Sequence, residues 1–227
     1  MRVWNDLKMH FRKLGLCRRC LKNRCFIHGI CLDCYQALPL ISGDVLTQPF
    51  SHHLDDLNIK IQAIFNYTGA VKEMICQLKY QQALWTVPIL GAVFIDRVAP
   101  IETDTAVIIP MPMHHRRRRK RGYNQVAVLA AWVANRLHMT VNMNLLTRNR
   151  DTEFQHGLNK QERIKNVKGC FTVKQYCHQP VILFDDVMTT GSSLREACRV
   201  LISAGYVDIR IWVIAVADLS AGACDAR

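Results

Sequence analysis

The stretch from Val181 to Ile202 combines a short apolar run, two adjacent acids, a run of small residues and a helical pattern. The apolar run, "VILF", is typical of a strand in a parallel sheet that is covered on both faces. The acids Asp185 and Asp186 follow it, and after the small residues apolar side chains recur from Leu194 at helical spacing. A buried strand that turns directly into an amphipathic helix predicts an α/β fold.

The same alternation of strands and helices fills the rest of the chain from residue 59 onward. It predicts a doubly wound, mostly parallel sheet. Asn124 is placed to cap one helix, and Ser193 with Glu196 offers a capping box for the last helix. We expect strands in 59–67, 105–112, 181–184 and 207–217, and helices in 68–80, 124–137 and from about Leu194 to before Gly205.

Ten cysteines are present, and four of them are paired as Cys17-x-x-Cys20 and Cys31-x-x-Cys34. Two such pairs predict a four-thiolate zinc site, because each short turn directs two sulfurs at one point and two turns complete a tetrahedron. A redox dithiol is the alternative. Within the loop between the pairs, Cys25 and His28 are expected to be spare. The remaining cysteines are expected to be small buried apolar residues: Cys76, Cys170, Cys177, Cys198 and Cys224.

The chain divides into three parts by its pattern. Residues 1–36 hold the cysteine pairs and are too few to fold on their own core, so bound zinc would supply folding energy. Residues 37–58 have little periodicity and are expected to be a linker, in which His52 and His53 are exposed rather than ligands. Residues 59–227 form the α/β domain.

The apolar segments are too short for a membrane protein. No run approaches the roughly 18 apolar residues of a membrane-spanning helix. The first residues mix charged and apolar side chains and contain no apolar core of a signal peptide. We therefore expect a cytoplasmic protein.

The small residues after the acids predict a phosphate site. Their backbone N–H groups can approach an anion closely, and the N-terminus of the following helix adds partial positive charge. The two aspartates would repel phosphate, but they suit two adjacent hydroxyls of a polyol or the water of hydrated Mg²⁺. Together these features point to a ribose 5-phosphate, and an ordinary strand-to-helix turn is the alternative. The residues of this candidate site are Asp185, Asp186, Thr189, Thr190, Gly191, Ser192 and Ser193.

This segment resembles the phosphoribosyl-pyrophosphate motif of the type I phosphoribosyltransferases: four apolar residues, two acids, two apolar residues and five small ones. It is neither a Walker A loop nor a G-x-G-x-x-G turn. The resemblance implies that Asp185 and Asp186 face the ribose hydroxyls. It also implies that Thr189 to Ser193 surround the 5-phosphate, with Mg²⁺ as a further cofactor of phosphoribosyl pyrophosphate.

The charge of the chain predicts an anionic partner. Thirty Lys and Arg against 18 Asp and Glu give a net charge of +12, although a basic protein without such a partner has the same composition. Six consecutive cations repel one another and predict a mobile loop unless an anion orders it. Tyr123 follows them, and basic plus aromatic residues suit single-stranded nucleic acid, whereas a solvated face is the alternative. The predicted nucleic-acid contacts are Arg116, Arg117, Arg118, Arg119, Lys120, Arg121 and Tyr123.

A second basic set lies in the long segment 147–169. The resemblance to the transferases implies that a long loop of this kind closes over the substrate. His156 within it could act in catalysis, although a lone histidine in a loop is usually just exposed. The cations of this set are Arg148, Arg150, Lys160, Arg163, Lys165 and Lys168.

Five segments in order resemble the ComF/GntX family over nearly the whole chain: the four-cysteine N-terminus, "QLKY", "IIPMP", "RRRRKRGYNQ" and the acid-pair motif. That family is associated with natural transformation or the use of external DNA, and no settled transferase reaction is attached to it. The resemblance places Lys79 of "QLKY" where a residue would contact pyrophosphate. A lysine that merely interacts with the helix macrodipole is the alternative.

These observations leave three functions open. The first is a competence protein that handles incoming single-stranded DNA in the cytoplasm together with other DNA-uptake proteins. The second is a Mg²⁺-dependent phosphoribosyltransferase that uses phosphoribosyl pyrophosphate and an unknown nitrogen acceptor, for which the sequence indicates no base pocket. The third is a nucleotide-responsive regulator that uses the phosphate site as a sensor.

Overall fold

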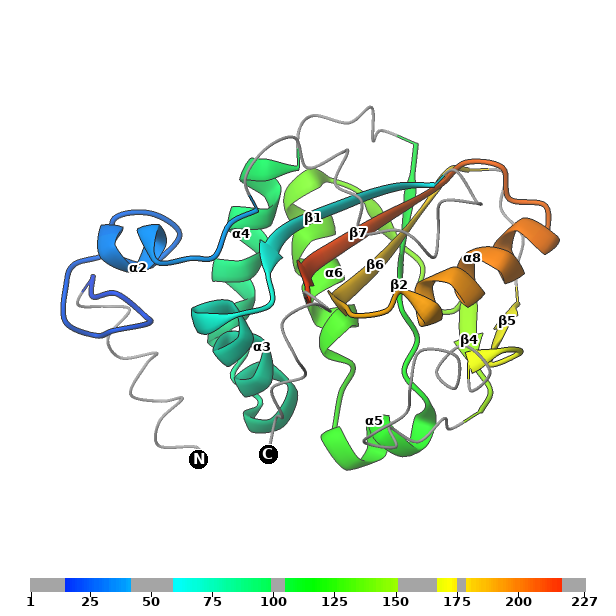
Figure 1. The fold of residues 1–227 in the computed structure, drawn as a ribbon, viewed down its shortest axis with the longest axis horizontal. Helices are drawn as coiled ribbons and strands as arrows, with labels where there is room; N and C mark the ends of the chain where they lie inside the picture. Colours follow the sequence, from blue (N-terminus) through cyan, green and yellow to red (C-terminus); the bar gives the residue numbers. More distant parts are fainter. Residues whose placement is uncertain (1–14, 42–58, 99–104, 151–166, 175–178, 218–227) are drawn as a thin grey trace.

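The computed structural model describes residues 15–41, 59–98, 105–150, 167–174 and 179–217 (Figure 1). Within these ranges a five-stranded sheet has the order β1-β7-β6-β2-β3, with every neighbouring pair parallel, and β4 and β5 form a separate antiparallel pair. This architecture confirms the predicted α/β fold with a mostly parallel sheet. The strands are β1 (Lys60–Asn66), β2 (Val107–Pro110), β3 (Thr140–Val141), β4 (Leu146–Arg148), β5 (Phe171–Val173), β6 (Val181–Met188) and β7 (Ile209–Val216).

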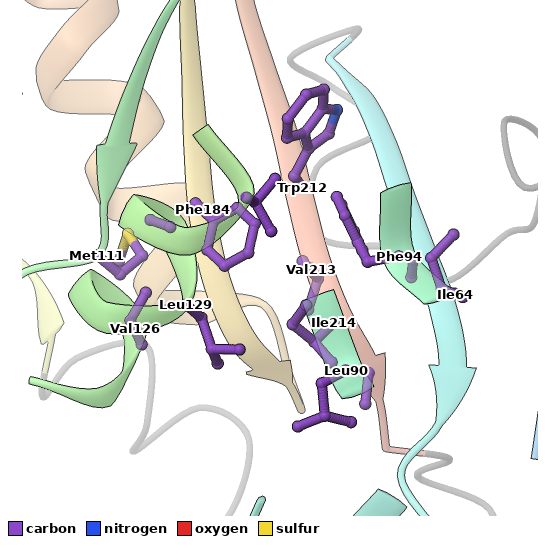
Figure 2. Close-up of a cluster of buried hydrophobic side chains, with 14 of the residues drawn as sticks. Ile64, Leu90, Phe94, Met111, Val126, Leu129, Phe184, Trp212, Val213 and Ile214 are labelled. Carbon is purple, nitrogen blue, oxygen red and sulfur yellow. The ribbon is translucent and has the colours of Figure 1, made fainter. Parts of the chain in front are cut away.

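Helices pack on both faces of the sheet. Helices α4 and α6 cover one face, where the Phe94 ring of α4 meets the rings of Phe184 and Trp212 edge-on, with ring centroids 5.6 Å apart in both pairs (Figure 2). Helix α8 packs against the opposite face (Figure 1). The helices are α2 (Leu32–Gln36), α3 (Gly69–Gln81), the 3-10 turn η2 (Leu84–Thr86), α4 (Val87–Arg97), α5 (His115–Arg121), α6 (Gln125–Leu137) and α8 (Ser192–Ser203). None of these described helices is both long enough and apolar enough to cross a bilayer.

The sequence predicted caps at the starts of two helices, and the structure confirms one of them and not the other. The cap at Asn124 is confirmed, because its side chain accepts the backbone N–H of Val126 at 3.0 Å. The capping box at Ser193 is wrong: α8 begins at Ser192, directly after Gly191 in the left-handed region at φ 70°. The Glu196 carboxylate instead accepts a hydrogen bond from the backbone N–H of Gly169 at 2.6 Å. This tertiary contact replaces the contact with the helix start that a capping box would make.

The predicted basic loop is a helix, α5. Arginine and lysine are good helix formers, and their charges spread around a helix that carries them on its exposed surface. The backbone N–H of Gly122 bonds to the carbonyl of Arg118 and ends the helix in the left-handed region, as a C-terminal glycine commonly does. The repulsion expected of the run is therefore outweighed by helix propensity and a well-formed end.

The segment after α2 lies along the edge of the sheet. Leu40 forms an isolated antiparallel bridge to Phe65 of β1, and the N–H of Ile41 bonds to the carbonyl of Ile64 at 2.9 Å. Residues 39–41, which the sequence pattern placed in the linker, thus pair with the edge strand. This pairing satisfies backbone groups that would otherwise be open to another chain.

Candidate functional site

The four paired cysteines come together in one cluster. The Sγ atoms of Cys17, Cys20, Cys31 and Cys34 all lie within 4.8 Å of one another, and those of Cys20 and Cys31 are 3.7 Å apart. A tetrahedral zinc with Zn–S bonds of about 2.3 Å separates its sulfurs by about 3.8 Å, so the cluster has a size that fits a metal ion. Cys25 is exposed and lies outside this cluster, as expected of a spare thiol.

Local backbone geometry positions the sulfurs. The N–H of Leu21 bonds to the carbonyl of Cys17, which closes the first turn, and Leu21 itself is left-handed at φ 59°. Cys31 precedes α2 and Cys34 lies within it. Two contacts tie this unit to the α/β domain: His28 meets Asp96 of α4, and Arg19 meets Glu73 of α3 at 3.9 Å. His28 is therefore a tether to α4 and lies outside the cysteine cluster.

The second cluster surrounds the acid pair. Both aspartates lie inside β6, which continues past them to Met188, whereas the sequence pattern ended the strand before them. Successive residues of a strand point to opposite faces, so the two side chains diverge. Asp186 is 4% exposed, and Asp185 is partly exposed and accepts the backbone N–H of Asp186 at 2.8 Å.

The environment of Asp185 favours its neutral form. Burial and the neighbouring Asp186 carboxylate raise the pKa of Asp185 to about 7, while the Asp186 N–H, Lys79 and Arg148 act in the opposite direction. A carboxyl group with a pKa near neutrality can hold or release a proton under ordinary conditions. Such a group is typical of a functional site.

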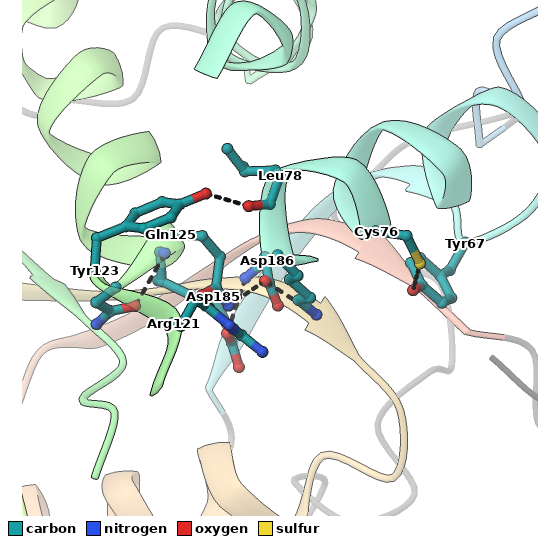
Figure 3. Close-up of polar contacts among 11 residues, drawn as sticks. Tyr67, Cys76, Leu78, Arg121, Tyr123, Gln125, Asp185 and Asp186 are labelled. Carbon is teal, nitrogen blue, oxygen red and sulfur yellow. Dashed lines mark hydrogen bonds and ion pairs between the residues drawn. The ribbon is translucent and has the colours of Figure 1, made fainter. Parts of the chain in front are cut away.

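Asp186 is the centre of a polar network that links three helices (Figure 3). Its Oδ2 accepts from Gln125 Nε2 at 2.7 Å and pairs with Lys79 Nζ at 3.1 Å. Gln125 Oε1 in turn accepts from Arg121 Nη1 at 2.5 Å. The path Arg121–Gln125–Asp186–Lys79 thus joins the basic helix α5, the start of α6, the strand β6 and the end of α3.

Lys79 lies beside the acid pair, with its Nζ 3.1 Å from Asp186 Oδ2. Its side chain is 18% exposed and points to Asp186, so it does more than interact with the helix dipole. A buried carboxylate needs a cation or hydrogen-bond donors nearby, and Lys79 and Gln125 together supply them. Gln125 was not predicted as a member of this cluster; its position next to the Asn124 cap was the available signal.

The small-residue segment connects β6 to α8. Gly191 adopts the left-handed conformation that lets the chain turn into the helix. Thr190 is buried, and its hydroxyl lies 3.0 Å from that of Ser192, while Thr189 is exposed. Ser192 and Ser193 form the first turn of α8, so the predicted five-residue loop is a three-residue turn followed by a helix start.

The predicted nucleic-acid contacts lie on α5 and the turn that follows it. Arg116, Arg118, Arg119 and Lys120 are exposed, and Arg117 and Arg121 are partly exposed. No ion pair joins the four exposed cations to any acidic side chain in the described part of the chain. Tyr123 differs from the expectation, because its ring is partly buried against the core and its hydroxyl donates to the carbonyl of Leu78 (Figure 3).

Part of the second basic set is described. The Arg148 guanidinium of β4 lies 5.5 Å above the Phe171 ring, and Arg150 donates to the carbonyl of Lys168. Of the other cysteines, Cys170 and Cys198 are buried as predicted, and Cys76 is partly buried beside the Tyr67 hydroxyl at 3.4 Å. The predictions for His52, His53, His156, Lys160, Arg163, Lys165, Cys177 and Cys224 fall outside the described residues.

The fold and site define an α/β protein with a parallel sheet, an acid pair near the carboxyl end of one strand, and a four-cysteine cluster beside the domain. No family model matches the chain. It is 29% identical over 218 residues to Competence protein F of Haemophilus influenzae, covering 91% of this chain and 93% of that protein.

Two more distant relatives bear similar names. The chain is 26% identical over 161 residues to the DNA utilization protein YhgH of Escherichia coli K12, covering 68% of this chain and 71% of that protein. It is 24% identical over 182 residues to Competence protein ComFC of Bacillus subtilis, covering 79% and 68%. These relatives confirm the resemblance to the ComF family that the sequence motifs indicated.

Proposed function

We propose that this protein acts in DNA uptake during natural transformation, where it binds incoming single-stranded DNA in the cytoplasm. The names of three relatives, two competence proteins and one DNA utilization protein, support the biological role. The observation that carries the binding proposal is α5, a helix with four exposed cations that no described acidic side chain neutralises. Phosphate backbones are a source of counter-charge for such a surface.

The acid pair and the adjacent turn are proposed to hold a ribose 5-phosphate group such as that of phosphoribosyl pyrophosphate. Asp185 and Asp186 would accept hydrogen bonds from ribose hydroxyls, and residues 189–193 would meet the phosphate at the start of α8. Lys79 lies next to the pair and would exchange its Asp186 contact for a pyrophosphate oxygen. Mg²⁺ would enter with the ligand, because the phosphates and a carboxylate are its usual partners.

The four cysteines are proposed to bind one structural zinc ion. All four positions are thiols, which zinc prefers in closed structural sites, and the compact cluster leaves no position that requires water. Residues 1–36 and the α/β domain of 59–227 would then be two units, with the metal stabilising the smaller one.

Measuring single-strand binding by fluorescence anisotropy over a salt series tests the DNA proposal. The log–log slope should be about −0.7 per phosphate contact. Replacing Arg116, Arg117, Arg118 and Arg119 by Ala should make the slope shallower by up to about 3 and weaken all sequences alike.

A matched control removes the same charge elsewhere. Lys22, Arg24, Lys60 and Arg97 are exposed and lie on other elements, so their replacement by Ala should leave the slope nearly unchanged. If the α5 variant keeps the original slope, or if both variants lose the same amount, α5 is a solvated face and the proposal fails.

A second candidate function is an active Mg²⁺-dependent phosphoribosyltransferase with an unknown acceptor. The raised pKa of Asp185 favours it, because a carboxyl that titrates near neutrality could take a proton from a nitrogen nucleophile. Calorimetric titration with phosphoribosyl pyrophosphate and Mg²⁺, with and without single-stranded DNA, distinguishes the two. If the protein binds phosphoribosyl pyrophosphate and consumes it when a nucleobase acceptor is added, the result supports the enzyme. If it binds phosphoribosyl pyrophosphate without turnover, and single-stranded DNA changes that affinity, the result supports a ligand-sensing DNA-binding protein.

A further inference from the structure

The last turn of α3 is where the acid pair and the basic helix meet. Its three successive residues face three different partners. The carbonyl of Leu78 accepts the Tyr123 hydroxyl, the ammonium of Lys79 reaches Asp186, and the ring of Tyr80 lies under the Arg121 guanidinium at 5.3 Å. One short piece of helix thus contacts the ligand site on its inner side and the basic helix on its outer side.

Tyr80 is unusually exposed for an aromatic residue in this protein. It is 68% exposed, and among the described residues only Phe26, at 69%, is a comparably exposed aromatic side chain. A single exposed aromatic ring needs no explanation by itself. Tyr80 differs from Phe26 in its surroundings, because a cation of α5 covers part of its ring and the remaining cations of α5 follow on the same short helix.

A second contact fixes this arrangement. The Arg121 guanidinium also donates a hydrogen bond to the side-chain oxygen of Gln125, Oε1, at 2.5 Å, so it is not free to leave the Tyr80 ring without losing that hydrogen bond. The backbone at Gly122 lies close to the end of α3, since a Cβ at this glycine would come 3.6 Å from Gln82 Nε2. The basic helix and the exposed ring are therefore parts of one continuous surface.

We propose that Tyr80 is the base-stacking residue of a single-stranded nucleic-acid site, with the cations of α5 contacting the neighbouring phosphates. This inference rests on the proposed DNA-binding function and names the residue that would read the unpaired bases. An aromatic ring beside a row of cations is the combination that single-strand binding sites use: backbone phosphates meet the cations, and a base lies flat on the ring. Arg121 covers part of one face of the same ring, and the base would lie on the opposite face.

Tyr80 suits this role better than Tyr123, which the sequence favoured. The hydroxyl of Tyr123 is bonded to the backbone of α3 and its ring packs against the core, so a base could reach little of it. Tyr123 instead fixes the turn after α5 to α3. Its effect on DNA binding would come through the position of the basic helix.

The test compares variants of Tyr80 in single-strand binding by the full-length protein, with a thymidine homopolymer as the probe. Tyr80→Ala should weaken binding roughly 5- to 100-fold, because one base loses its stacking partner, while the salt slope stays nearly unchanged. Tyr80→Phe keeps the ring and should bind like the wild type. Phe26→Ala removes an equally exposed ring away from α5 and should have no effect, and a blunt duplex, whose bases are paired, should bind Tyr80→Ala and wild type alike.

A direct readout accompanies the affinities. A probe carrying 5-iododeoxyuridine, irradiated in the complex, should crosslink to Tyr80, and mass spectrometry of the digested protein locates the modified residue. Crosslinking to Tyr123 instead, or equal binding by Tyr80→Ala and wild type, would overturn the inference. The proposed function fails separately, if the wild type binds no single strand or if its salt slope is unchanged by the four-arginine variant.

Discussion

Replacing Asp185 should stabilise the fold at high pH and leave it nearly unchanged at low pH. Burial and the Asp186 carboxylate raise the pKa of Asp185 from its ordinary value of 3.8 to about 7. The folded protein therefore binds a proton on Asp185 over a pH range in which the unfolded chain has lost it. The stabilisation that the wild type gains from this bound proton is fully present below about pH 4 and is lost as the pH rises through 7.

The structure sets the size of this effect. A pKa difference of that size changes the contribution of Asp185 to the free energy of unfolding by roughly 4 kcal/mol between low and high pH. Asp185 retains some contact with solvent, which lowers the figure to about 2 kcal/mol. In Asp185→Asn the titrating group is gone, so the variant should be about 2 kcal/mol more stable than the wild type at pH 8 and nearly equal to it at about pH 3.5.

Urea unfolding of wild type and variant at several pH values measures the difference directly. Contributions of histidines and of the cysteine cluster are common to both proteins and cancel. The matched control is Asp186→Asn, which weakens the bonds from Gln125 and Lys79 and should cost about 1–3 kcal/mol at pH 8. A difference between wild type and Asp185→Asn that does not change with pH, or an Asp186→Asn that is equally stabilising, would refute the reasoning. Both substitutions should weaken binding of ribose 5-phosphate.

Three further outcomes are expected. Metal analysis of the purified protein should find one zinc per chain, and the Cys17→Ser, Cys31→Ser double variant should lose it, whereas full retention would rule out the cluster as the site. Gln125→Leu should lower the free energy of unfolding by about 1–2 kcal/mol in a urea titration, because Asp186 and Arg121 each lose a partner, and an unchanged value would show that the network contributes nothing. Gly91→Ala should cost about 1–3 kcal/mol in the same assay, since a Cβ there would come 2.5 Å from the Trp132 ring, and a neutral result would mean that α4 and α6 can separate without loss.

The sequence by itself determined the order of the elements and the kinds of chemistry. Apolar runs and helical spacing depend only on neighbours along the chain, so β1, β2, β6, β7, α3, α6 and α8 could be located from them. The cysteine pairs could be located as well, because their spacing alone brings two sulfurs together. The short elements β3, β4 and β5 and the helix α4 lacked a clear local signal and were not predicted. Their stability comes from partners elsewhere in the chain.

Only the tertiary structure decided which side chains meet. Lys79, Gln125 and Asp186 are far apart in sequence, and they form one network because the end of α3 and the start of α6 converge near the carboxyl end of the central strand β6. The same convergence turned Tyr123 toward the backbone of α3 and left Tyr80 exposed beneath Arg121. The composition shows that a chain carries cations and aromatic rings, whereas the packing of distant elements determines which of them remain at the surface to bind a ligand.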